Sequence, residues 1–216
     1  MLAGQKGYGA NGLQNALFPF DCMYITNGED TSSGSHVDML AIDFVGWTNQ
    51  TGQIDQYPYY APFDCQLVAK EYNTMMCWQS LTNVNRIDGS VGITTIGFGH
   101  DNDYPNVPIG TIKRQGELIG HTGTRGNVGD HCHMEVVAGI YAGFVQVPAT
   151  GYMKMKNGVH IYNVLGVNDT TIYRGLGYNW RSFSTNTPTP PTPPTPLIRE
   201  GKFPWVLYAK KLREKG

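Results

Sequence analysis

The residues with the clearest capacity for chemistry are two histidines in the stretch Asp130-His131-Cys132-His133-Met134-Glu135-Val136-Val137. Polar and apolar residues alternate here as in a half-buried β-strand, in which residues two apart share a face. His131 and His133 are therefore expected to point the same way, and Cys132 and Met134 the opposite way. Because a strand fixes both imidazoles in advance, the pair is a candidate metal site. The alternative is two histidines on a solvated strand face.

Two further residues are candidates on local grounds. Asp43 interrupts the apolar run Ala41-Ile42-Asp43-Phe44, where a carboxylate is costly to bury unless it is hydrogen-bonded or coordinates a cation. An aspartate that caps a turn would explain it equally simply. His100 ends the strand-like run Gly97-Phe98-Gly99-His100. The glycine-punctuated loop over residues 119–130 leads directly into the two-histidine strand, and such a loop brings backbone N–H groups close to a ligand.

The elements that must position these side chains are predicted to be short strands. Strand character recurs about every dozen residues with glycine or proline between, which favours an antiparallel sheet or barrel over βαβ units. The predicted segments are residues 40–46, 57–60 and 65–70 around a turn at 61–64, then 75–80, 91–98, 117–120, 130–137 and 160–165. The fold class predicted is mainly β, with long loops.

Composition divides the chain into four parts. Residues 1–20 are glycine-rich and then apolar, and are predicted to be an arm that docks on the main domain, residues 21–186. Residues 187–196 alternate threonine and proline, which predicts a polyproline-type linker. Residues 197–216 carry six basic and two acidic residues, with Trp205, Tyr208 and Leu212 at helical spacing after Pro204. This tail is predicted to form a short C-terminal helix that contacts an anionic surface or a partner.

Net charge, hydropathy and cysteine content argue against several classes of protein. A formal net charge of −1 over 216 residues argues against a general nucleic-acid binder. There is no run of about 18 apolar residues to span a membrane, and the first residues lack the pattern of a secretory signal. Cys22, Cys65, Cys77 and Cys132 show no zinc-type spacing and no disulfide framework. Buried free thiols are expected, with a Cys22–Cys77 or Cys65–Cys77 bridge as the alternative.

The order of these motifs resembles the lysostaphin/LytM-like zinc metallopeptidases of peptidase family M23. The most specific part is Ile119-Gly-His-Thr-Gly-Thr-Arg-Gly-Asn-Val-Gly-Asp-His-Cys-His-Met-Glu-Val136, which is similar to the family's glycine loop and H-x-H-x-E-V strand. A histidine followed by an aspartate lies upstream, and an isolated histidine lies between the two motifs. The match covers roughly residues 18–147, with a motif core at 36–147. It implies an antiparallel core of the LytM (duplicated hybrid motif) type.

One spacing departs from most of the family. The usual H-x-x-x-D would place the carboxylate at Leu40, which cannot bind zinc, whereas His36 and Asp43 are seven residues apart. The longer spacing resembles the peptidase domain of the tail-tip morphogenesis protein of small Bacillus phages and indicates a loop insertion. Asp38 is the rival ligand. We favour Asp43 because Ala-Ile-Asp-Phe is the context in which the family places its ligand.

The resemblance implies roles for five residues. His36, Asp43 and His133 would hold Zn²⁺, with an open position at which water acquires a pKa near ~7. His131 would take a proton from that water, and His100 would help hold the water or stabilise the oxyanion. Glu135 is a candidate partner of His133. His121 and His160 are not expected to take part, and nothing is expected to pair with His160. Several tyrosines either line a peptide groove or are simply sheet surface: Tyr24, Tyr57, Tyr59, Tyr60 and Tyr104.

The function implied is hydrolysis of peptide bonds in bacterial peptidoglycan by a phage-encoded enzyme. It would reach the cell wall through a holin or as a virion component. Two alternatives stay open. A non-catalytic M23-like structural module would keep the fold without the metal, although all five positions are retained here. A cupin also carries H-x-H on a strand, but it places its glutamate further downstream than Glu135.

Overall fold

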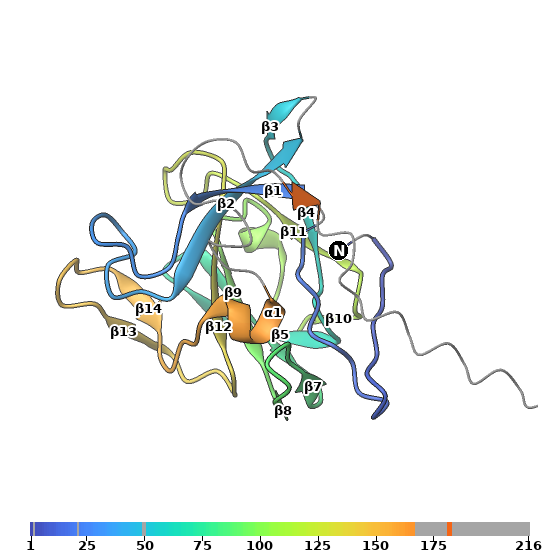
Figure 1. The fold of residues 1–216 in the computed structure, drawn as a ribbon. Helices are drawn as coiled ribbons and strands as arrows, with labels where there is room; N and C mark the ends of the chain where they lie inside the picture. Colours follow the sequence, from blue (N-terminus) through green and yellow to red (C-terminus); the bar gives the residue numbers. More distant parts are fainter. Residues whose placement is uncertain (2, 21, 49–50, 167–180, 183–216) are drawn as a thin grey trace, which may run out of the picture.

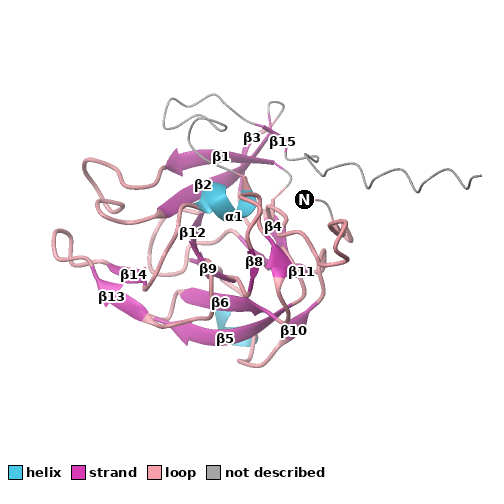
Figure 2. Ribbon diagram, turned by 60° about the horizontal axis from the view of Figure 1, so that its bottom comes forward, coloured by secondary structure: helices cyan, strands magenta, loops and turns pink. Residues whose placement is uncertain are grey.

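Antiparallel pairing arranges the chain around one sheet of nine strands (Figures 1 and 2). The structure is a computed structural model that describes residues 1, 3–20, 22–48, 51–166 and 181–182. The strands follow the order β10-β5-β6-β9-β12-β2-β1-β15, and β3 pairs with β2. Their bounds are β1 (Cys22–Asn27), β2 (Ala41–Thr48), β3 (Gly52–Ile54), β5 (Cys65–Glu71), β6 (Met75–Ser80), β9 (Thr95–Gly99), β10 (Ile112–Lys113), β12 (Cys132–Val137) and β15 (Arg181–Ser182).

Smaller elements surround this sheet. Three two-stranded ribbons are β4 (Pro58–Tyr60) with β11 (Leu118–His121), β7 (Val84–Asn85) with β8 (Val91–Gly92), and β13 (Phe144–Gln146) with β14 (Met153–Met155). A 3₁₀ turn spans Tyr104–Asn106, and the helix α1 spans Ile161–Leu165. Both views show the β1–β2 loop and the β13–β14 hairpin on the same side of the molecule (Figures 1 and 2).

The alternation predicted for the two-histidine strand is confirmed by β12. Cys132, Met134 and Val136 are fully buried in the main apolar cluster, and His133 lies on the other face, directly opposite Asp43 of β2. In β2 the neighbours of Asp43, Ile42 and Phe44, enter the same core. Burial of alternate residues on two adjacent strands therefore leaves the polar residues together on one face.

The prediction of a mainly β, antiparallel fold is confirmed, as are strands near residues 41–48, 65–71, 75–80 and 132–137. The predicted strand at 91–98 is two strands, β8 and β9. The cysteines with described side chains, Cys65, Cys77 and Cys132, are free and buried. The linker at 187–196, the tail at 197–216 and its helix lie outside the described residues. No helix in the described part of the chain is long and apolar enough to cross a membrane.

The strand predicted at residues 160–165 is wrong, because this segment forms α1. Its buried residues, Ile161, Val164 and Leu165, follow the i, i+3, i+4 spacing of a helix rather than the alternation of a strand. The carboxylate of Glu29 accepts the Ile161 N–H at 2.7 Å and so satisfies one free amide of the first turn. Gly166 ends the helix at φ 74°, a conformation that suits glycine.

Asp64 is one of several residues that attach the N-terminal arm to the sheet domain. One oxygen of this carboxylate accepts hydrogen bonds from the Gln14 side chain at 2.8 Å and the Gln115 N–H at 2.9 Å. The other oxygen lies 2.8 Å from the Arg114 guanidinium. Burial opposes ionisation, but these hydrogen bonds and the adjacent Arg114 charge keep the pKa of Asp64 below its ordinary value. The ionised carboxylate therefore stabilises the docked arm.

We expect Asp64→Ala to lower the free energy of unfolding by about 2 kcal/mol at neutral pH, because the carboxylate loses its hydrogen bonds from Gln14, the Gln115 N–H and Arg114. The Asp64 side chain is only 24% exposed, so solvent does not fully screen these interactions. A carboxylate with a depressed pKa stabilises the fold above its unfolded-state pKa and loses that effect as the pH falls. The difference from wild type should shrink as the pH drops below about 4. Urea unfolding at several pH values measures it.

Asp55→Ala is the matched control, since this carboxylate is exposed and accepts a local hydrogen bond from Gln53. Its effect should stay within about 0.5 kcal/mol at every pH. An Asp64→Ala difference that grew toward low pH would contradict the assignment.

Candidate metal centre

Three side chains from separate parts of the sequence converge on one face of the sheet. Asp43 lies on β2 and His133 lies opposite it on β12. His36 comes from the β1–β2 loop and is buried. One ligand atom from each of the three lies within 4.8 Å of the other two. The structure therefore brings together the three residues for which the sequence predicts metal binding.

The spacing between the facing nitrogen and oxygen atoms of the three residues suits a zinc ion. His36 Nε2 lies 3.2 Å from Asp43 Oδ2 and 3.3 Å from His133 Nδ1. His133 Nδ1 lies 2.9 Å from Asp43 Oδ1. Zinc–ligand bonds of about 2.0–2.1 Å in a tetrahedron place neighbouring ligand atoms about 3.3 Å apart. The donors need little movement to surround an ion of this size.

Hydrogen bonds fix which ring nitrogen of His36 and His133 carries the hydrogen. The outer nitrogen of each ring, which faces away from Asp43, is protonated, so the inner nitrogen, which faces Asp43, keeps its lone pair. His36 Nδ1 lies 2.9 Å from the Gly28 carbonyl oxygen, which can only accept a hydrogen bond, so Nδ1 carries the hydrogen. His133 Nε2 donates in the same way to Glu135 Oε1 at 3.2 Å. With both outer nitrogens protonated, neutral His36 and His133 direct lone pairs toward the carboxylate of Asp43. This donor set fits a divalent cation, which would remove the repulsion between the three atoms.

Without a cation, protons reduce part of the repulsion between the facing atoms of these residues. Burial penalises the charged forms of Asp43 and His133, but the hydrogen bonds and opposite charges between the two residues overcome the penalty. The pKa of Asp43 is lowered far below its ordinary range. The pKa of His133 is raised to about 10, with Glu135 adding to the effect of Asp43. The centre is thus a strongly anionic position that attracts a positive charge.

His131 and His100 form the rim of the same site. The His131 Nδ1–H donates to the Gly129 carbonyl at 2.7 Å, so its Nε2 is the basic nitrogen, 3.9 Å from Asp43 Oδ1. The His100 Nδ1–H likewise donates to the Arg125 carbonyl at 2.7 Å. The two rings lie 4.3 Å apart between centroids. All five residues proposed for the site therefore lie in one cluster.

The backbone and burial of His100 constrain its chemistry. The residue has φ 70°, an uncommon conformation for a side chain larger than glycine. Burial lowers the pKa of His100 to about 4, and the neighbouring His131 and His133 act in the same direction against the Arg125 carbonyl. The ring is therefore neutral near pH 7, with its hydrogen on Nδ1.

Gly99 provides the space in which His133 lies. It pairs with His133 across β9 and β12. A Cβ atom on Gly99 would lie 3.0 Å from the His133 Cβ and 2.8 Å from the Met75 sulfur. The glycine before His100 is therefore required by close approach of neighbouring side chains.

The structure places the other predicted residues away from the cluster. Asp38, the rival ligand, is exposed, with φ 54°. Tyr59, expected as a groove residue, is instead fully buried, and its hydroxyl donates to Asp101 at 2.6 Å. His121 lies 2.8 Å from an Asp103 oxygen. The expectation that nothing pairs with His160 is wrong, because this ring lies 2.9 Å from a Glu29 oxygen at the start of α1.

Sequence reasoning missed the groups that orient three of the imidazoles. They are the carbonyl oxygens of Gly28, Gly129 and Arg125. Every residue has a carbonyl, so no residue type marks these positions. The only signal was the density of turn formers in the loops before His36 and His131.

The comparisons with known proteins include a sequence relative and partial similarities to solved structures. No protein-family model matches the chain. The chain is 38% identical over 179 residues to Morphogenesis protein 1 of Bacillus phage B103, an alignment covering 82% of this chain and 46% of that protein. The chain thus spans about half the length of this relative. The predicted resemblance to morphogenesis proteins of Bacillus phages is confirmed.

The structural similarities cover about three fifths of the chain. A zinc containing peptidase from Vibrio cholerae has a TM-score of 0.39 and 16% identity, covering 61% of this chain and 42% of that one. The catalytic domain of the antimicrobial peptidase lysostaphin from Staphylococcus simulans has a TM-score of 0.35 and 16% identity, covering 57% and 84%.

We expect Asp43→Asn to abolish stoichiometric metal binding, because it removes the only carboxylate in the three-residue set. Asp38→Asn should bind about one zinc per chain like wild type, since the Asp38 side chain is exposed and outside that set. Metal analysis after dialysis, together with a zinc titration, measures both. Loss of the metal in Asp38→Asn and its retention in Asp43→Asn would reverse the ligand assignment.

Proposed function

We propose that the chain is a zinc-dependent endopeptidase that hydrolyses amide bonds of bacterial peptidoglycan. The observation that carries the proposal is the convergence of three lone-pair donors at the spacing of a zinc tetrahedron, with two further imidazoles beside them. Two histidines and one carboxylate leave a coordination position for water, as catalytic rather than closed structural sites do. Zinc in this position would polarise the scissile carbonyl and lower the pKa of water.

His131 is proposed as the general base. Its Nδ1–H is committed to the Gly129 carbonyl, so Nε2 is free to accept a proton and points toward the cluster. The side chain is 18% exposed, so the attacking water can reach it. After accepting the proton, His131 can pass it to the leaving amine, as a general base commonly does in amide hydrolysis.

His100 is proposed to hold the attacking water. The resemblance left two roles for this residue, and the oxyanion role requires an N–H that points at the developing charge. The one N–H of neutral His100 is already donated to Arg125, and its lowered pKa keeps the second nitrogen unprotonated near pH 7. His100 Nε2 therefore accepts a hydrogen from the water rather than donating one to the oxyanion.

The similarity to a phage morphogenesis protein supports a phage-encoded chain. A protein named for morphogenesis favours a virion component over a free endolysin. The basic segment 197–216 suits contact with another virion protein or an anionic surface, and the low net charge gives no support to nucleic acid as a partner. A non-catalytic structural module is the second candidate, and the same relative supports it.

The deciding experiment is digestion of purified cell walls. The metal-replete chain should release new amino groups from the walls, and a chelator should stop the release until zinc is added back. His133→Ala should lose both zinc and activity, since it removes a ligand. A chain that binds zinc stoichiometrically and releases no amino groups from walls of any cross-link type would leave only the structural module.

We expect His131→Ala to retain about one zinc per chain and to lose roughly 10²–10⁴-fold in kcat, the range of a positioned general base. The metal is retained because His131 lies outside the three-residue ligand set. Metal analysis and wall digestion on the same sample separate the two effects. His121→Ala is the matched control, since this ring pairs with Asp103 away from the cluster, and its kcat should stay near wild type.

A further inference from the structure

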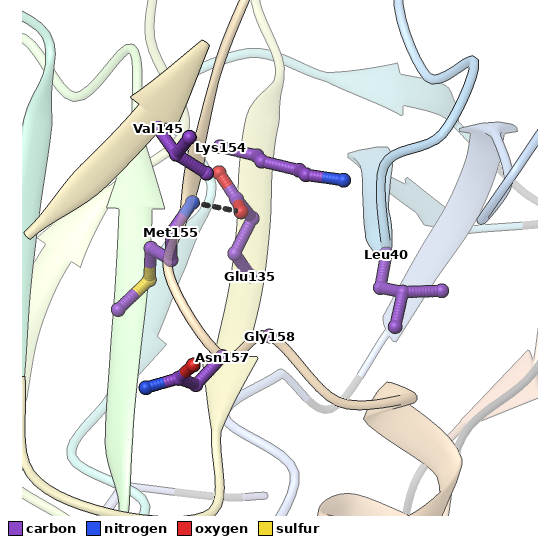
Figure 3. Close-up of a pocket in the computed structure, with 7 residues that line it drawn as sticks. All are labelled: Leu40, Glu135, Val145, Lys154, Met155, Asn157 and Gly158. Carbon is purple, nitrogen blue, oxygen red and sulfur yellow. Dashed lines mark hydrogen bonds between the residues drawn. The ribbon is translucent and has the colours of Figure 1, made fainter. Parts of the chain in front are cut away.

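A cavity of about 170 Å³ lies beside the metal centre and shares one residue with it. That residue is Glu135, whose Oε1 accepts from His133 and whose Oε2 accepts the Met155 N–H at 2.7 Å. The cavity lies between the β2–β12 part of the sheet and the β13–β14 hairpin (Figure 3). Its volume is close to that of cavities that admit a group of about six heavy atoms. It is lined by Leu40, Glu135, Val145, Lys154, Met155 and Asn157, with Gly158.

The cavity lies within about two residues of the position expected for the reacting bond. Glu135 follows His133 by two residues on the same face of β12, which is a distance of roughly 7 Å along a strand. An extended peptide covers this distance in about two residues. A substrate that runs along β12 with its scissile bond at His133 would therefore place a side chain one or two positions away in the cavity.

The charges in the cavity favour one kind of side chain. Leu40, Val145 and Met155 provide apolar walls. Both oxygens of Glu135 are occupied and the residue is only 2% exposed, so its carboxylate is not available to a ligand. Figure 3 shows the Lys154 side chain extending across the cavity toward the Leu40 side, with its ammonium directed away from Glu135.

The Lys154 ammonium has capacity for a ligand. Among the described residues its one acceptor is the Asp38 carbonyl oxygen, and an ammonium has three N–H donors. We propose that this cavity is a specificity subsite for an acidic residue of the peptide: an aliphatic stem would pack on Leu40, Val145 and Met155, and its carboxylate would bind the Lys154 ammonium. The assignment rests on the proposed endopeptidase function and names the substrate class of the same site.

The test uses two forms of one cell wall as the probe. One form keeps its free carboxylates, and in the other they are converted to primary amides with carbodiimide and ammonium. The wild-type chain should cut the free-acid wall about tenfold or more faster, because the amide lacks the charge that pairs with Lys154. Lys154→Met keeps the aliphatic stem and should cut both walls at the amidated-wall rate. Lys154→Arg should retain the wild-type preference.

Lys156→Met is the matched control, since Lys156 is exposed two residues further along and does not line the cavity. It should keep the wild-type ratio. If Lys154 acted only by holding the Asp38 loop, Lys154→Met would slow both walls equally and keep their ratio, which would overturn the subsite. Equal cutting of both walls by wild type would also overturn it and leave the endopeptidase function intact. A zinc-replete wild type that cuts neither wall would overturn both proposals.

Discussion

The site depends on which nitrogen of each imidazole carries the hydrogen. In all four rings it is the outer nitrogen, which faces away from the centre of the site. Each of the four rings has an acceptor behind it: the carbonyls of Gly28, Arg125 and Gly129 for His36, His100 and His131, and the carboxylate of Glu135 for His133. A hydrogen on the outer nitrogen leaves a lone pair on the inner one when the ring is neutral. Four rings that could otherwise adopt either tautomer therefore present bases to one small volume, which is the arrangement a metal and a proton acceptor require.

The sheet makes this arrangement possible by separating two kinds of surface. Asp43 and His133 lie opposite each other on neighbouring strands, while the residues on either side of them are buried in the apolar core of the opposite face. Moving either strand by one residue would bury the ligands and expose the core, so the free energy of core packing also fixes the register of the site. Gly97 and Gly99 on β9 leave room next to Glu135 and His133, because a Cβ at either position would meet neighbouring side chains.

Sequence reasoning succeeded where residue type and spacing carry the information. Alternation on β12 predicted which face His131 and His133 share, and Asp43, the aspartate in an apolar context, lies with His36 and His133 whereas Asp38 is exposed. Sequence reasoning failed where the structure depends on contacts between residues that lie far apart in the sequence. The five-residue segment Ile161–Leu165 is too short for the spacing of its buried residues to predict a helix alone, and the Glu29 carboxylate that accepts its first free amide lies more than a hundred residues away in sequence. Backbone carbonyls have no sequence signature, and Tyr59 was assigned to a surface although a buried Asp101 accepts its hydroxyl.

The β1–β2 loop connects these features, because it contributes to both the ligand set and the cavity. It carries His36, which is held by the Gly28 carbonyl within the same loop. It also carries Leu40, which lines the cavity, and the Asp38 carbonyl, which accepts from Lys154 of β14. The longer spacing between His36 and Asp43 thus leaves an apolar residue at position 40, where a ligand would otherwise be expected. A peptide carboxylate bound to the Lys154 ammonium would therefore lie next to the loop that also holds His36.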